Sequence, residues 1–194
     1  MIRLLVLILV LIGCGVYVNR MIRKRRSERL AQARAAFLAR VDAPREHRPT
    51  FKEAVLRNGA VRMRLPAHWA EEYPDEDHAS FHDPGNPQRV LRVKSAAVAA
   101  PDGLRSLLQG HAGREATTIE DLPGGCLILR SVDASRGDGQ DLVVFRWLLA
   151  SPLPPSGARL ATFTLSLPEK TVFDPLAQNV VAMLDSEIIS AGIN

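Results

Sequence analysis

The feature that most constrains this chain is an unbroken apolar run near its start, followed at once by basic residues. Residues 4–18 carry no charge, and residues 20–29 contain six Lys or Arg. A helix needs about 20 apolar residues to cross the hydrocarbon of a bilayer. The run is shorter than that, but the aliphatic stems of Arg3 and Arg20 can extend it towards the headgroups. We therefore expect residues 1–20 to form a transmembrane anchor.

The charges on either side of the run predict its orientation. Arg3 stands before it, whereas six cations follow within residues 20–29. The flank that is richer in Lys and Arg remains in the cytoplasm in most membrane proteins. We expect a single-pass protein, in a bacterial inner membrane, whose C-terminal domain is cytoplasmic. The same basic flank is suited to contact anionic membrane lipid.

Cys14 supports a second interpretation of this stretch. Leu11-Ile12-Gly13-Cys14 resembles a bacterial lipobox, whose cysteine carries the lipid, and this would make the protein a periplasmic lipoprotein. A small cysteine packed inside a membrane helix is the alternative. The chain stays apolar after Cys14 and then becomes basic, whereas a lipoprotein tether is usually polar. This favours the transmembrane anchor.

The rest of the chain divides into a connecting segment and one domain. Residues 21–50 begin with helix-forming residues, and Leu30 and Phe37 belong to a narrow apolar stripe that Pro44 brings to an end. We expect a juxtamembrane helix and a linker there. Residues 51–194 are enough for one globular domain with its own core.

The net charge of +4 is unevenly distributed along the chain. Residues 1–64 hold fifteen Lys/Arg against four Asp/Glu, whereas residues 65–194 hold ten against seventeen. The basic character therefore belongs to the membrane end, and the globular part is mildly acidic. This balance argues against a nucleic-acid partner.

The domain alternates apolar strands with turn-forming residues. Asn58-Gly59 separates two strand-like segments, 51–56 and 61–65, and predicts a hairpin because both residues tolerate a positive φ. Further strands are expected at 79–82, 89–99, 115–120, 126–132, 142–149 and 159–167.

Two helices are expected among these strands. A short one follows Asp102 as N-cap and stops at Gly110. The other begins with Asp174 as N-cap and Pro175 at its first position. Its predicted apolar stripe consists of Leu176, Val180, Met183, Leu184 and Ile188. The stripe needs a sheet to cover, so we predict an α+β fold: a mostly antiparallel sheet with helices packed on its faces.

Several segments of the domain resemble a known family. These are residues 61–69, Phe81-His82-Asp83-Pro84, the strand Leu91-Arg92-Val93, the region of Trp147 and Phe163, and the closing helix. They are similar to the Mog1/PsbP/DcrB-like group of α/β/α sandwich domains, over residues 51–194. The resemblance implies a non-catalytic role, since that group includes a photosystem subunit, a nuclear transport factor and secretion-effector chaperones. It carries over no catalytic, cofactor-binding or metal residue.

The region from His68 to Asp83 contains the residue types that bind metals. His68, His78, His82 and Asp83 lie there among acidic neighbours, but a zinc site needs about four converging ligands. Ser80 stands between two of the histidines and lacks the Gly-x-Ser-x-Gly turn that exposes a hydrolase nucleophile. We interpret the region as a solvated acidic loop, with a metal-binding or hydrolytic protein as the alternative.

Cys126 follows two glycines and could be an accessible nucleophile. A cysteine at the start of an apolar strand is more often part of the core, which is the interpretation we favour. The sequence thus predicts a membrane-anchored, non-catalytic domain without a cofactor, used for protein binding, assembly or chaperoning.

Overall fold

The computed structural model describes residue 28 and residues 50–112, 118–137 and 140–193. The expected anchor, Cys14 and nearly all of the connecting segment lie outside these ranges. Within them, no helix has the length and apolar character that crossing a membrane requires.

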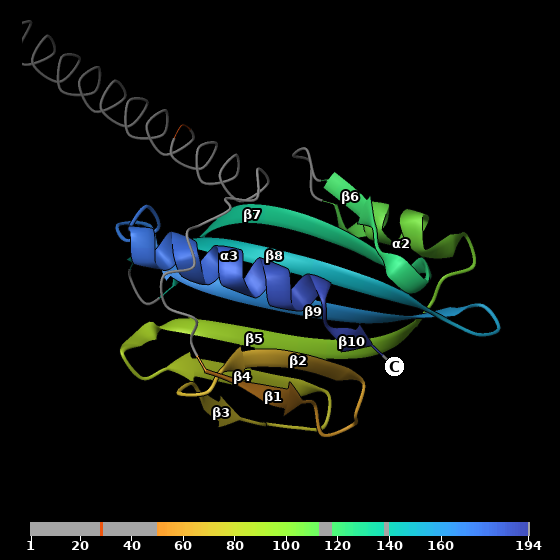
Figure 1. Ribbon diagram of the computed structural model, residues 1–194. Helices are drawn as coiled ribbons and strands as arrows, with labels where there is room; N and C mark the ends of the chain where they lie inside the picture. Colours follow the sequence, from red (N-terminus) through yellow and green to blue (C-terminus); the bar gives the residue numbers. More distant parts are fainter. Residues whose placement is uncertain (1–27, 29–49, 113–117, 138–139, 194) are drawn as a thin grey trace, which may run out of the picture.

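Seven of the strands form one antiparallel sheet, with the order β3-β4-β5-β9-β8-β7-β6 (Figure 1). Most neighbouring strands of this sheet also follow one another in the sequence, separated by short segments. The exception is β5 with β9. The bounds are β3 (Ala70–Glu72), β4 (His78–Asp83), β5 (Asn86–Ala99), β6 (Thr118–Asp121), β7 (Leu127–Gly137), β8 (Gln140–Leu153) and β9 (Gly157–Pro168).

A smaller antiparallel sheet has the order β1-β2-β10. Its strands are β1 (Phe51–Val55), β2 (Val61–Pro66) and β10 (Gly192–Ile193). The hairpin predicted at Asn58-Gly59 is confirmed: Gly59 has a φ of 69°, and the Asn58 side chain accepts a hydrogen bond from the Ala60 amide at 2.9 Å.

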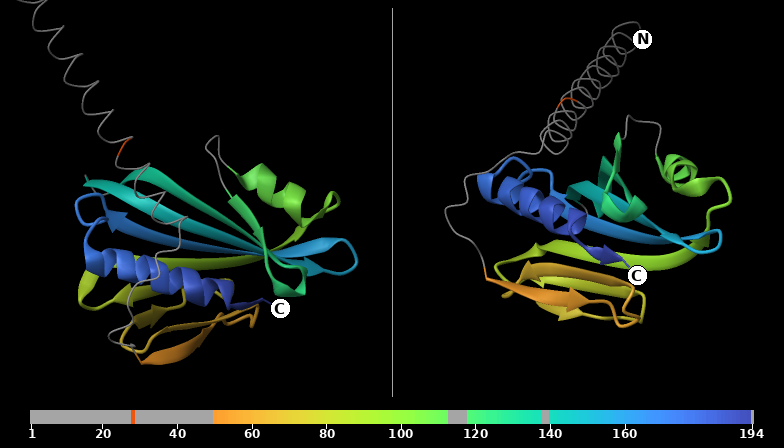
Figure 2. Two further views of the ribbon diagram at one scale, coloured as in Figure 1. Left: turned by 45° about the horizontal axis from the view of Figure 1, so that its top comes forward. Right: turned by 45° about the vertical axis from the view of Figure 1, so that its right-hand side comes forward.

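The helices lie on opposite faces of the large sheet. Helix α3 (Pro175–Ile189) and the small sheet cover one face (Figures 1 and 2). Helix α2 (Gly103–His111) packs on the other face, and a short 3-10 turn, η1 (Pro123–Gly125), precedes β7. The α+β sandwich of antiparallel sheets and helices expected from the sequence is confirmed.

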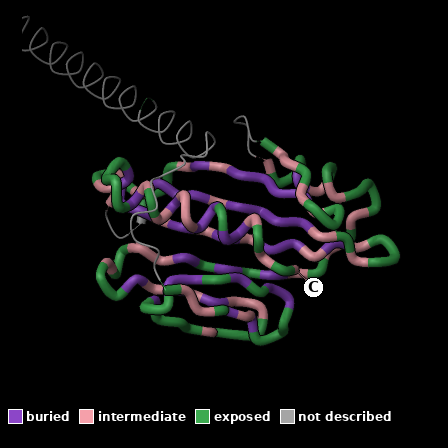
Figure 3. Tube along the Cα trace, viewed as in Figure 1, coloured by how far each residue is buried: buried purple, intermediate pink, exposed green. Residues whose placement is uncertain are grey.

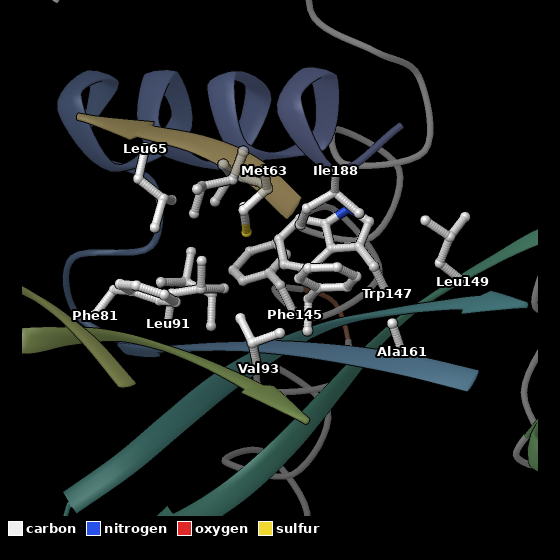
Figure 4. Packing of buried hydrophobic residues seen from close by; sticks show 14 of the residues in the cluster. Met63, Leu65, Phe81, Leu91, Val93, Phe145, Trp147, Leu149, Ala161 and Ile188 are labelled. Carbon is white, nitrogen blue, oxygen red and sulfur yellow. The ribbon is translucent and has the colours of Figure 1, made fainter. Parts of the chain in front are cut away.

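The main core fills the space between the large sheet and the layer formed by α3 and β2 (Figure 4). Alternate side chains of β8 point into this core, because successive side chains of a strand point to opposite faces. Buried residues colour the middle of the long strands in Figure 3, while the turns at their ends are exposed. The largest core side chains are Trp69, Phe81, Phe145, Trp147 and Phe163.

The predicted apolar stripe of α3 is partly wrong. Leu176 is 74% exposed, and Val180 and Met183 are only half-buried. The buried face is rotated so that it contains Asp185 and Glu187, because each of these carboxylates has a cationic partner. The residues of α3 that are buried are Ala177, Val181, Leu184, Asp185, Glu187 and Ile188.

The helix ends also differ from expectation. Pro175 occupies the first turn of α3 as predicted, but neither Asp174 nor Asp102 makes a side-chain hydrogen bond as an N-cap. Helix α2 continues past Gly110 to His111. Cys126 is half-buried just before β7, not inside the core strand.

Candidate functional site: an uncovered face of the large sheet

The position of α3 is fixed by charges that it buries against the sheet. Asp185 accepts hydrogen bonds from Arg130 Nε at 2.6 Å and from Trp147 Nε1 at 2.8 Å. Glu120 of β6 accepts a further one from Arg130 Nη1 at 2.7 Å. Desolvation lowers the pKa of Arg130, but its bonds with Asp185 and Glu120 outweigh this and raise it, so the guanidinium stays charged.

A second ion pair joins α3 to the small sheet. Glu187 accepts two hydrogen bonds from Arg64, at 2.9 Å from Nε and 3.0 Å from Nη2. The Arg64 guanidinium also lies 5.5 Å from the centre of the Phe51 ring. One face of the large sheet is therefore closed by α3 and the small sheet, and the charged groups that α3 buries there are paired.

The opposite face is covered by α2 at one end only. Leu108 of α2 is fully buried in a second, smaller core, and Arg105 donates to the Asp121 carboxylate at 2.9 Å. The sheet residues of this core are Leu127, Leu129, Leu148, Ala150 and Leu160. All of them lie near the same end of the strands, so α2 leaves the rest of this face without cover from the described chain.

The uncovered part presents a row of side chains that runs across five strands. The register pairs Ser80 with Arg92, Arg92 with Thr164, Thr164 with Arg146, and Arg146 with Ser131. Neighbouring strands are about 4.8 Å apart. We define the cationic face as this row together with the adjacent residues Lys94, Thr162 and Ser166.

The charged residues of the cationic face as defined are all positive, with acidic Glu72 opposite Ser80 at its border. Arg92 and Lys94 are exposed, and no side chain of the described ranges pairs with either of them. Arg146 is half-buried and lies 3.6 Å from Asp133 of the neighbouring strand. Hydroxyl groups on β9 stand between the cations. A surface of this kind attracts carboxylates or other anions and can also form hydrogen bonds to them.

The histidines proposed from the sequence do not form one cluster. His68 Nε2 lies 3.7 Å from Asp83 Oδ1. Asp83 forms an ion pair with Arg89, with 2.6 Å between Oδ2 and Nη1. His82 Nε2 lies 3.4 Å from Glu72 across the β3–β4 pair. The His68–Asp83 region therefore divides into separate contacts.

His78 has acidic partners of its own. Its Nδ1 lies 2.7 Å from Asp75 and 2.9 Å from Asp77, and ligand atoms of these three residues lie within 4.8 Å of one another. Desolvation raises the pKa of Asp75, but hydrogen bonds from Asp77 and His78 outweigh it and lower the pKa below its usual value. Hydrogen bonding accounts for the way these surface groups gather.

The two candidate nucleophiles are not hydrogen-bonded to a base by any described side chain. Ser80 faces outward on β4, and among the described residues no hydrogen bond joins it to His78 or His82. Cys126 has a half-buried free thiol, and among the described residues only its backbone carbonyl forms a hydrogen bond, from the Leu122 amide at 2.8 Å.

The cationic face itself was not singled out from the sequence, although a signal was present. Arg92 and Lys94 occupy alternate positions of β5, and Arg146 occupies an outward position of β8. Charged residues at regular outward positions of central strands indicate a face that no helix covers.

No protein-family model matches the sequence, and no curated protein matches it. Similar folds occur among solved structures. A protein of Bacteroides thetaiotaomicron has a TM-score of 0.52 and 14% identity, with 74% of this chain and 48% of that one covered. This chain thus spans about half the length of that protein. The likeness shows a shared fold.

Two smaller proteins are similar at lower scores. The Ran-binding protein Mog1p of Saccharomyces cerevisiae has a TM-score of 0.48 and 11% identity, over 75% of this chain and 96% of that one. LpqN of Mycobacterium tuberculosis, involved in cell envelope biogenesis, has a TM-score of 0.46 and 10% identity, over 71% and 90%.

Proposed function

We propose that this protein is a membrane-anchored, non-catalytic binding domain, and that its cationic face holds an acidic surface of a partner protein. The observation that carries the proposal is the pair of exposed cations Arg92 and Lys94, which no described side chain pairs with, and Arg146 two strands away. These side chains project from the middle of long paired strands, so the backbone beneath them is held in place.

The chain's own basic flank is a poor occupant of this face. Residues 20–29 contain six Lys or Arg and one acidic residue, Glu28. Like charges repel one another, and the repulsion increases where water is excluded. A partner with Asp or Glu at its surface gains attraction instead, which raises the association rate and fixes the register of the complex.

The anchor is the second part of the proposal. Residues 1–20 would span the membrane, with the basic flank on anionic lipid and the domain in the cytoplasm. A lipid on Cys14 would instead place the domain in the periplasm. Protease added to intact cells whose outer membrane has been permeabilised should leave a C-terminal tag intact. Cleavage of the tag, with lipid labelling lost in Cys14→Ser, would establish the lipoprotein instead.

The non-catalytic role is supported by the separation of the candidate groups. No hydrogen bond between described side chains joins Ser80 or the Cys126 thiol to a histidine, and His78 Nδ1 is occupied by Asp75 and Asp77.

Crosslinking in cells tests the binding role. A photoreactive amino acid in place of Thr164, at the centre of the cationic face, should capture a protein in a defined crosslinked band. Charge reversal by Arg92→Glu with Lys94→Glu should reduce that band at least tenfold, because the attraction becomes repulsion. The matched control is Arg62→Glu, an exposed cation on β2 outside this face.

The result can also contradict the proposal. A band that survives the double reversal, or that Arg62→Glu removes equally, would show that the cationic face does not recognise the partner. Thermal unfolding of each variant confirms that the fold is intact.

A further inference from the structure

Two large apolar side chains stand exposed at the start of α3. Phe173 is 43% exposed and Leu176 is 74% exposed, and they are the large hydrophobic residues that the described ranges leave open to solvent. Apolar surface in water is unfavourable, and a pair so close in sequence makes a local apolar spot. The main core does not use either residue.

The exposure is built into an ordered turn. The Thr171 amide donates to Pro168 O at 3.0 Å, and the Asp174 amide donates to Thr171 O at 3.0 Å. Val172 is fully buried, and its carbonyl oxygen accepts a hydrogen bond from the Gln178 side chain. Since Val172 is held inward, the side chain of its neighbour Phe173 is held outward.

The location of the pair relates it to the anchor. The start of α3 and the start of β1 lie at the same end of the domain in all three views (Figures 1 and 2). At Phe51, the first residue of β1, the domain joins the segment that leads back to residues 1–20. Lys170 is exposed in the same loop, and Asp174, the acidic residue between Phe173 and Leu176, is exposed as well.

We propose that Phe173 and Leu176 insert into the surface of the bilayer that holds residues 1–20, and thereby orient the domain. The inference rests on the proposed membrane anchor. Two side chains alone bind a bilayer weakly, but a tether holds them at an effective concentration in the millimolar range, so that a weak contact is occupied. Lys170 can face anionic headgroups.

This contact has a consequence for the binding surface. Strands of the large sheet run lengthwise away from the end that carries the start of α3 (Figure 1). With that end at the bilayer, the cationic face stands to the side and stays open to a partner.

The test uses the full-length chain reconstituted in vesicles of phosphatidylcholine and phosphatidylglycerol that contain nitroxide-labelled lipid. An environment-sensitive fluorescent amino acid replaces Leu176, and in a matched sample it replaces Gln109, an exposed residue of α2. We expect the probe at position 176 to be quenched at least threefold more than the probe at 109. Phe173→Gln should remove most of this difference, while the chain still floats with the vesicles.

Each other outcome overturns the inference. Equal quenching at the two positions, in chains that float with vesicles, rejects the bilayer contact and leaves the anchor standing. Chains that do not float reject the anchor and the contact together. Self-association that Phe173→Gln abolishes, without quenching at position 176, would make the pair a contact between copies of the chain.

Discussion

Arg130 of β7 and Asp185 of α3 form a buried ion pair, with 2.6 Å between Nε and Oδ1. The two residues are only 4% and 6% exposed. Charges removed from water lose their hydration and must be compensated by partners inside the protein. This pair therefore determines how α3 sits on the sheet.

Replacement of Asp185 by Ala should strongly destabilise the fold. Arg130 would keep only Glu120, and the Trp147 indole would lose its acceptor. We expect the free energy of unfolding to fall by about 3–5 kcal/mol, measured by urea denaturation followed through tryptophan fluorescence. Asp185→Asn, which keeps an oxygen for Trp147, should cost less. A loss below about 1 kcal/mol in Asp185→Ala would contradict the assigned role.

The ion pair between Arg64 and Glu187 should contribute less. Glu187 is buried but Arg64 is largely exposed, so the remaining carboxylate can regain some water. Arg64→Ala should lower the free energy of unfolding by about 1.5 kcal/mol, as for a hydrogen bond to a charged group. Arg62→Ala is the control, since Arg62 and its partner Glu53 are both exposed, and it should change stability by about 0.5 kcal/mol or less.

These ion pairs also explain why part of the fold escapes prediction from the sequence. The Asn58-Gly59 hairpin and the strand expected at 142–149 depend on neighbours in sequence, and the sequence predicts both. The register of α3 depends on Arg130, which is distant in sequence. The sequence places Leu176 in the apolar stripe of α3, whereas the structure exposes Leu176 and buries Asp185.

Leu108 is the fully buried residue by which α2 packs on the sheet. It is fully buried among leucines of β7 and β8, whereas Leu104 and Leu107 are half-buried. Leu108→Ala should cost about 2–5 kcal/mol. Hydrogen exchange should show faster exchange in α2 than in α3, because the loss is local. Equal acceleration in both helices would instead mean that they unfold together.

Stability at high pH should depend on Tyr73. Burial, and then the hydrogen bond and negative charge of Glu71, raise the pKa of Tyr73 to about 12. The folded state therefore keeps a proton that the unfolded chain loses near pH 10. The stabilisation from Tyr73 is complete below about pH 10 and is lost between about 10 and 12 as the pH rises.

The titration can be observed directly. In a Tyr17→Phe background, Tyr73 is the remaining tyrosine, and phenolate absorbance should give a midpoint near 12 in the folded protein. Glu71→Gln should move the midpoint towards its ordinary value. A midpoint near 10 in the Tyr17→Phe protein that retains Glu71 would show that the hydrogen bond between the Tyr73 hydroxyl and Glu71 is absent in solution.

The candidate site was harder to predict than the strands that form it. Arg92 and Arg146 lie on outward positions of strands that the sequence correctly indicates. Whether that face is open depends on where α2 packs, and Leu108 decides this through contacts with strands that follow it in the chain. The histidines suggested a cluster because they are close in sequence, but their carboxylate partners separate them.

The pairing of β10 with β2 has a consequence for folding during synthesis. Gly192 lies opposite Arg62, and Ile193 lies opposite Val61. On the ribosome β1 and β2 emerge early, yet this edge of β2 receives its partner only after α3 has been made. Until then β2 has an unpaired edge, which is a site for association with other chains. A nascent domain should therefore be most vulnerable to aggregation just before its last strand appears.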